Sequence, residues 1–252
     1  MSRNFELLQK LGKEQDIVVP SAKDAFPQAS PIAAASAAQA AAADNPGIEE
    51  INGVVHQIFL VPRAAAPRTV VFASPEQGSG CSWVCAHVAD VLAARVAGSV
   101  CLVDANLRNP SLHSQFGIEN HRGISEALLQ PDPIRTFVRP LGLPNLWLIS
   151  GGSSAEAAQG FLASDRMRLR MTELKAEFDF VLVDTPAMNA SNEAFSIGSL
   201  ADGVVVVLKA NASRKQTARQ AIEQLQGGKA RVLGAVLNQR TFPIPESIYK
   251  RL

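Results

Sequence analysis

Residues 75–83, "PEQGSGCSW", have the closely spaced glycines typical of a phosphate-binding loop but lack the lysine that such a loop usually carries. The pattern G-x-x-x-x-G-K-S/T places that lysine before a serine or threonine, and here Cys81 stands before Ser82. Gly78 and Gly80 can adopt the backbone angles that turn successive amide N–H groups toward an anion, and a helix N-terminus should follow them. The stretch therefore predicts a loop shaped for phosphate but without its usual cation.

Apolar runs recur at regular intervals after this loop and just before it. They lie at residues 69–73, 100–103, 146–149, 180–183, 204–208 and 232–237. Because the runs are continuous rather than alternating, they predict strands buried on both faces of a mostly parallel sheet. Helical periodicity over residues 84–96 and 167–178 falls between them. The sequence therefore predicts a doubly wound α/β fold, in which ligands bind at the carboxyl ends of the strands.

The chain divides by composition into three parts. Residues 1–19 contain a short amphipathic helix, and residues 20–47 form an Ala/Pro-rich linker with too few large apolar groups to offset the entropy of ordering. Residues 48–252 hold all the predicted strands. We expect one globular domain of this last part, with the first two as an appendage.

Charge and cysteine content exclude several classes of protein. A net charge of +1 makes no case for nucleic acid as a partner, and the arginines at 166, 168 and 170 indicate a solvated helix face. Three cysteines do not form a disulfide framework, and Cys81, Cys85 and His87 lack further ligands for a metal site. No signal peptide or transmembrane segment is apparent, so we expect a cytoplasmic protein.

Two aspartates end predicted strands near the loop. Asp104 closes "CLVD" and Asp184 closes "FVLVD", and an acidic residue in that position beside a phosphate loop can hold a magnesium-bound water. Both could instead be helix caps or turn formers, and Ser82 could be an N-cap rather than a magnesium ligand. The order and spacing of the three features together indicate a P-loop fold.

These motifs resemble the bacterial tyrosine kinases (BY-kinases) of the CpsD/CapB type, within the wider MinD/ParA group of P-loop proteins. The resemblance covers about residues 48–252 and extends to "ANLRNPSLHSQFGIENHRGISEALL" and "GAVLNQRTFPIPESIYKRL". It implies ATP or ADP and Mg²⁺ as cofactors, capsular or exopolysaccharide biosynthesis or export as the process, and a membrane-spanning chain-length regulator as partner. The implied catalytic residues are Asp104 and Asp184, and Ser82 joins them as a magnesium ligand. The implied nucleotide-binding residues are Gly78, Ser79, Gly80, Cys81, Ser82, Trp83, Asn238 and Arg240.

The chain departs from the family pattern at several functional positions. Asn106 replaces the second aspartate of D-x-D-x-R, and Ala187 replaces the second proline of D-S/T-P-P. The ring-forming motif E-x-x-R-x-x-R has Gly53 and His56 in place of both arginines. The tyrosine-rich tail is reduced to Tyr249, the single tyrosine of the chain and its one candidate phosphorylation site.

Loss of the loop lysine affects turnover more than binding. Its charge-assisted contacts to phosphate are worth ~1.5–3 kcal/mol each, so binding should weaken about ten- to a hundredfold. Phosphoryl transfer depends on electrostatic stabilisation of the moving group, and a thiol cannot supply it. We therefore expect a regulatory pseudokinase, monomeric or dimeric, recruited to the inner membrane by its partner. Two alternatives stay open: an active autokinase with an atypical loop, and a MinD/ParA-type positioning ATPase.

Overall fold

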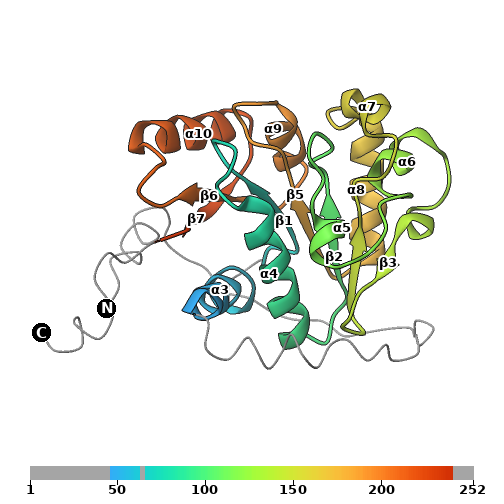
Figure 1. Cartoon of the computed structure of the whole chain (residues 1–252), viewed down its shortest axis with the longest axis horizontal. Coiled ribbons are helices and arrows are strands. Elements are labelled where there is room, and N and C mark those ends of the chain that lie inside the picture. Colours follow the sequence, from blue (N-terminus) through green and yellow to red (C-terminus); the bar gives the residue numbers. More distant parts are fainter. Residues whose placement is uncertain (1–45, 63–65, 241–252) are drawn as a thin grey trace, which may run out of the picture.

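The computed structural model describes residues 46–62 and 66–240. The predicted N-terminal helix, all but the last two residues of the predicted linker, and Tyr249 lie outside these ranges. Within them the chain forms one layered α/β unit (Figure 1). No helix in the part that the structure describes is long and apolar enough to span a membrane.

A seven-stranded sheet forms the centre of the molecule (Figure 1). Its strands are β1 (Thr69–Ala73), β2 (Val100–Asp104), β3 (Arg139–Pro140), β4 (Leu146–Ile149), β5 (Phe180–Asp184), β6 (Gly203–Lys209) and β7 (Val232–Asn238). Their order across the sheet is β3-β4-β2-β5-β1-β6-β7, and all pairs are parallel except β3 with β4. The predicted doubly wound fold is confirmed. Strand β3 was not predicted, because two residues, one of them a proline, are too few to show a periodic pattern.

Helices cover both faces of the sheet. They are α3 (Pro46–Val55), η1 (His56–Leu60), α4 (Cys81–Arg95), α5 (Leu112–Gln115), α6 (Ile124–Leu129), η2 (Ile134–Phe137), α7 (Ala155–Ala158), η3 (Gln159–Phe161), α8 (Asp165–Glu177), α9 (Glu193–Gly198) and α10 (Lys215–Gly227). One hydrophobic cluster joins the sheet to α3, η1 and α4, and the other joins it to α6, α8, α9 and α10. Strand β1 contributes Phe72 to the first cluster and Val71 to the second, which explains why its apolar run is continuous.

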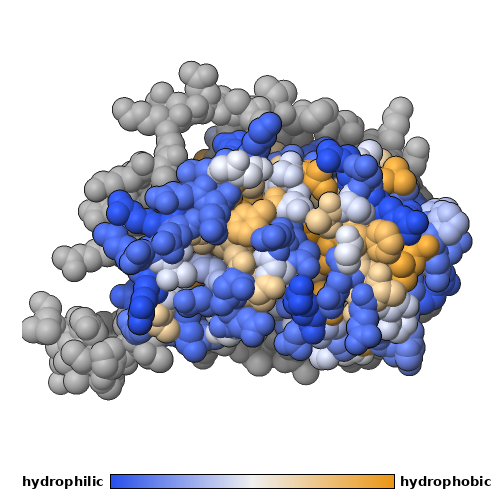
Figure 2. Space-filling model, turned by 90° about the horizontal axis from the view of Figure 1, so that it is seen from above, coloured by the Kyte–Doolittle hydropathy of each residue, from blue (hydrophilic) through white to orange (hydrophobic). Residues whose placement is uncertain are grey.

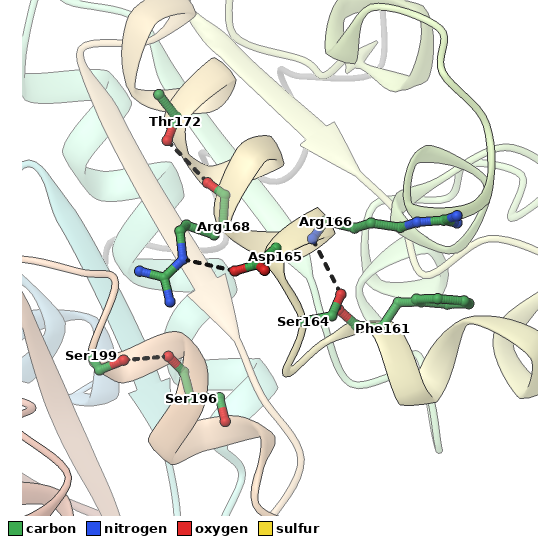
Figure 3. Close-up of polar contacts among 8 residues, drawn as sticks. All are labelled: Phe161, Ser164, Asp165, Arg166, Arg168, Thr172, Ser196 and Ser199. Atoms are coloured by element: carbon green, nitrogen blue, oxygen red, sulfur yellow. Dashed lines mark hydrogen bonds and ion pairs between the residues drawn. The ribbon is translucent and has the colours of Figure 1, made fainter.

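The start of α8 shows how local chemistry sets a helix boundary (Figure 3). Ser164 is the N-cap, and its hydroxyl accepts a hydrogen bond from the backbone N–H of Arg166 at 3.2 Å. Arg168 pairs with Asp165 in the first turn, and the Arg166 guanidinium lies over the Phe161 ring, 4.5 Å from its centroid.

The expectation of a solvated arginine face on α8 is wrong for Arg170. This side chain is 5% exposed, and it donates to the carbonyl oxygens of Ala127 and Gln130 at 2.7 and 2.6 Å. Glu173 neutralises its charge at 2.7 Å. The guanidinium therefore joins α8 to the C-terminal end of α6, a long-range contact that charge spacing along one helix does not reveal.

The parallel register places the predicted site at one edge of the sheet. Asp104 on β2 is the direct neighbour of Asp184 on β5, and Phe72 on β1 is the neighbour of Asp184 on the other side. Strand β1 leads into the glycine loop and α4, which begins near the top of Figure 1 and descends. Figure 2 looks down on this upper side and shows a mostly hydrophilic face with smaller hydrophobic groups.

Candidate functional site

The glycine loop has the backbone conformation that the sequence predicts. Gly78 and Gly80 have φ values of 77° and 76°, in the left-handed region. Gly80 is the N-cap of α4, and no side chain caps the first turn of that helix. The first-turn N–H groups are therefore free of a side-chain acceptor, as an anion-binding loop requires.

Replacing Gly80 by alanine should destabilise the protein by about 1–2 kcal/mol, because a left-handed φ is costly for a residue with a Cβ atom. The new Cβ would also overlap the Asn238 side-chain amide. Thermal or urea unfolding measures the loss. Gly53→Ala is the matched control: Gly53 lies inside α3 with no atom near its missing Cβ, so this variant should be unchanged or about 1 kcal/mol more stable. Equal effects in both variants would contradict the prediction.

Two side-chain amides at the end of β7 contact the carbonyl oxygens of the glycine loop. Asn238 donates from Nδ2 to the carbonyl oxygen of Ser79 at 2.9 Å and to that of Gly80 at 3.5 Å. Gln239 donates from Nε2 to the carbonyl oxygen of Gly78 at 3.1 Å. The sequence analysis predicted that Asn238 binds the nucleotide, and it assigned no role to Gln239. The only sequence signal for Gln239 is its position two residues after the predicted strand at 232–237.

Asp184 lies beneath the loop and is fully buried. Its Oδ2 accepts a hydrogen bond from the Ser82 hydroxyl at 2.5 Å, and Cys81 directly precedes this serine on α4. Its Oδ1 is buried and has no partner among the described residues. Burial, and next the negative charge of Asp104, raise the pKa of Asp184 above its usual range.

Asp104 has a different set of partners. Its carboxylate accepts from the backbone N–H groups of Asn106, Ser111 and Leu112 at 3.2, 3.0 and 3.0 Å. Burial raises its pKa, and these three hydrogen bonds partly offset that effect. Asp104 thus holds the loop after β2 and the start of α5, which is the turn-forming role left open by the sequence. Its place beside Asp184 leaves a metal-binding role open as well.

The Cys81 thiol cannot replace the missing cation. Cys81 is 8% exposed, and burial followed by the charge of Asp184 raises its pKa well above the ordinary thiol value. The group is therefore a neutral, weak donor. The side chains of Asp104, Asp184, Ser82 and Cys81 therefore bring no positive charge to this site. The guanidinium of Arg108 is paired with Glu193 instead, at 3.6 Å.

The donor set fits magnesium better than a softer metal. Mg²⁺ binds through one or two carboxylates together with hydroxyl, water and phosphate oxygens, and the unpartnered Oδ1 of Asp184 beside Ser82 offers such oxygens. His87 is turned toward Trp83, with ring centroids 3.9 Å apart and its Nδ1 2.8 Å from the Trp83 carbonyl oxygen. In residues 46–62 and 66–240, no group of three or more His, Cys, Asp or Glu side chains is arranged around a common metal position.

Trp83 and Arg240 lie at the exposed margin of this region. Trp83 follows Ser82 on α4 and is 36% exposed. Arg240 follows Gln239 and is exposed. The structure thus gathers the glycine loop, Ser82, Asp184 and Asn238 into one site through direct contacts.

A parallel sheet with a glycine loop after a central strand, and acids ending two neighbouring strands, defines a P-loop NTPase domain. Solved structures of similar fold include the chimerical protein CapA2B2 (TM-score 0.72, 24% identity, 79% of this chain and 87% of that one). They also include the kinase domain of Escherichia coli tyrosine kinase ETK (0.67, 22%, 81% and 82%) and the MinD protein of Pyrococcus horikoshii complexed with Mg-ADP (0.60, 19%, 73% and 76%).

Sequence comparison gives the family. The family model of the ATPase MipZ matches residues 68–213. Tyrosine-protein kinase YwqD of Bacillus subtilis is 32% identical over 171 residues, which are 68% of this chain and 72% of YwqD. The putative tyrosine-protein kinase EpsB of Ralstonia nicotianae is 30% identical over 77% of this chain but only 26% of EpsB. The chain belongs to the bacterial tyrosine kinase family, within the MinD/ParA-like group of P-loop proteins.

Proposed function

We propose that this protein is a regulatory BY-kinase-like component of capsular or exopolysaccharide biosynthesis or export, with weak or absent ATP turnover. The observation that carries the proposal is the buried Cys81 at the lysine position, a thiol that burial and the charge of Asp184 keep neutral. The family resemblance supplies the process, and the kinase names of the relatives support it.

Nucleotide binding is compatible with this role. The loop N–H groups after Gly78 and Gly80 would hold phosphate oxygens, and Asn238 and Arg240 would lie toward the base. Magnesium, held by Ser82, Asp184 and Asp104, would supply charge neutralisation on the phosphates. Backbone donors carry only partial charges, so binding without the lysine ammonium should be weak.

Catalysis is less compatible with the same geometry. The transition state of phosphoryl transfer needs a preorganised cation near the transferred group. Removal of one preorganised hydrogen-bond donor typically lowers the rate by ~10²–10³. Cys81 offers a neutral, buried thiol in place of an ammonium group. The site can therefore retain a nucleotide without turning it over, which suits a ligand-dependent regulator.

An active autokinase is the second candidate. The 2.5 Å contact between Ser82 and Asp184 supports it, since this hydroxyl–carboxylate pair is poised to hold magnesium. Tyr249 would be its phosphorylation site. A MinD/ParA-type positioning ATPase is a third candidate, and the MipZ match supports it.

Calorimetric titration with ATP and with ADP, each with and without magnesium, tests the binding part of the proposal. We expect weak binding of both nucleotides, with an affinity that increases when magnesium is present. Asp184→Asn is the matched control, because it keeps the shape of the side chain and removes the negative charge that magnesium needs. Magnesium-dependent binding in the wild type that persists in Asp184→Asn would contradict the assigned site.

The purified protein should be monomeric or dimeric. Gly53 and His56 lie exposed on α3 and at the start of η1, where the family's ring-forming arginines would stand, and neither can form a bidentate guanidinium contact. Light scattering at working concentration measures the mass. A stable octamer of the wild type would contradict the prediction, whereas a larger assembly in Gly53→Arg/His56→Arg alone would support it.

A further inference from the structure

We propose that Asn238 and Gln239 act as an amide clamp that positions the glycine loop for anion binding. The clamp consists of the three hydrogen bonds from these side chains to the carbonyl oxygens of Gly78, Ser79 and Gly80. Its use in binding rests on the proposed function, but its effect on the free loop does not. Both residues are positioning residues, since they contact the loop rather than a reacting group.

The clamp determines which way the loop N–H groups point. In a planar trans peptide the C=O and N–H bonds point in opposite directions. The carbonyls of Gly78, Ser79 and Gly80 belong to the peptide units that carry the N–H groups of Ser79, Gly80 and Cys81. Drawing the carbonyls of Gly78 and Ser79 toward β7 therefore turns the N–H groups of Ser79 and Gly80 to the other side of the loop. The Gly80 carbonyl also accepts the Val84 N–H of α4 at 3.0 Å, so the helix shares in orienting that peptide unit. Donation to a carbonyl also polarises the same peptide unit and makes its N–H a better donor.

The clamp is anchored to the sheet. Asn238 is the last residue of β7 and pairs with Lys209 of β6, and its carbonyl oxygen accepts from the Ala210 N–H at 2.8 Å. Gln239 follows with a φ of 58°, a left-handed conformation that non-glycine residues rarely adopt. Backbone hydrogen bonds to β6 therefore hold the end of β7 in place independently of the side-chain contacts with the loop.

The close packing at Gly80 gives independent support. A Cβ at this position would overlap the Asn238 amide nitrogen, so the glycine and the clamp fit one another. The neighbours of the Asn238 amide are carbonyl oxygens, which only its NH₂ group can face favourably. The amide orientation therefore follows from its surroundings.

Hydrogen exchange of the ligand-free protein, followed in the peptide that spans residues 74–84, tests the clamp. Asn238→Leu and Gln239→Met keep side-chain size and add no charge but remove the donors. Gln239→Met removes one hydrogen bond and Asn238→Leu removes two, and each should raise exchange of the protected Val84 amide in this peptide, whose N–H donates to the Gly80 carbonyl, about tenfold or more through local opening. Gln239→Lys restores a donor and should return exchange toward the wild-type rate. Gln220→Met, at an exposed site on α10, is the matched control and should change nothing.

Unchanged exchange in both donor-free variants would overturn the proposal, as would an equal rise in the distant strand β4, which would indicate general destabilisation. If Asn238→Leu fails to fold, Gln239→Met and its lysine rescue decide the question, since Gln239 is exposed. ATP hydrolysis by the wild type separates the two proposals: turnover well above that of Asp184→Ala would count against the proposed function, while loop exchange still decides the clamp.

Discussion

Cys81→Lys is expected to bind ATP about ten- to a hundredfold more tightly than the wild-type protein. A lysine ammonium at the start of α4 would add charge-assisted contacts to the phosphates, worth ~1.5–3 kcal/mol each. It would also place a positive charge beside Asp184, which in the wild type accepts from the neutral Ser82 hydroxyl. Calorimetry with Mg-ATP measures the change. Cys81→Met, which fills the position without a charge, should leave affinity near the wild-type value.

ATP hydrolysis by the wild-type protein should not exceed that of Asp184→Ala. The variant lacks the one carboxylate that contacts Ser82, so it defines the background rate. Cys81→Lys need not restore kinase activity, because Asn106 and the reduced tyrosine content are separate departures from the family. Wild-type hydrolysis well above background, or phosphate on Tyr249, would contradict the pseudokinase reading and favour the autokinase.

Glu126→Ala should lower the free energy of unfolding by about 3 kcal/mol, because several buried donors would lose a charged acceptor. The Glu126 carboxylate is 5% exposed and ties α6 to the loop after β4. It accepts from the backbone N–H groups of Gly123, Ser153 and Ser154 at 2.8, 3.1 and 2.9 Å, and from the hydroxyls of Ser125 and Ser153 at 3.0 Å each. Urea unfolding measures the loss.

Glu156→Ala is the matched control for this variant. Glu156 lies exposed in the first turn of α7, so its removal should change stability by no more than ~0.5 kcal/mol. A loss in Glu126→Ala no larger than in Glu156→Ala would show that the carboxylate does not hold the loop.

The same carboxylate predicts a pH dependence. Burial alone would raise the pKa of Glu126, but hydrogen bonds from Gly123, Ser154 and Ser125 outweigh it and lower the pKa to about 2, from 4.5. A carboxyl whose pKa is lower in the folded state stabilises the protein fully above its unfolded pKa. The contribution of Glu126 is therefore lost as the pH falls from 4.5 to about 2. Wild type and Glu126→Gln should converge in stability over that window; a constant difference would contradict the assignment.

Local patterns were sufficient for six of the seven strands and for the edge of the sheet that carries the site. Continuous apolar runs indicate strands buried on both faces, and parallel strands bring their carboxyl ends to one edge, so Asp104 and Asp184 had to lie near the glycine loop. The positive φ value at Gly80 was also predictable, because the motif requires glycine directly before the lysine position, and Gly78 can adopt the same conformation because it has no Cβ atom. Each of these signals lies within a few consecutive residues.

The partners of the site residues were decided by the tertiary structure. Nothing near Asp104 in the sequence chooses between a metal ligand and a turn former, and three backbone N–H groups now occupy its carboxylate. The Asn238 amide meets a carbonyl 159 residues away, and Arg170 meets Ala127 across 43 residues. Such contacts depend on how strands and helices are ordered in space, and periodicity along one element holds no information about that order. The sequence by itself therefore determined the fold class and the missing charge at Cys81, while packing alone decided which groups surround that thiol and hold it neutral.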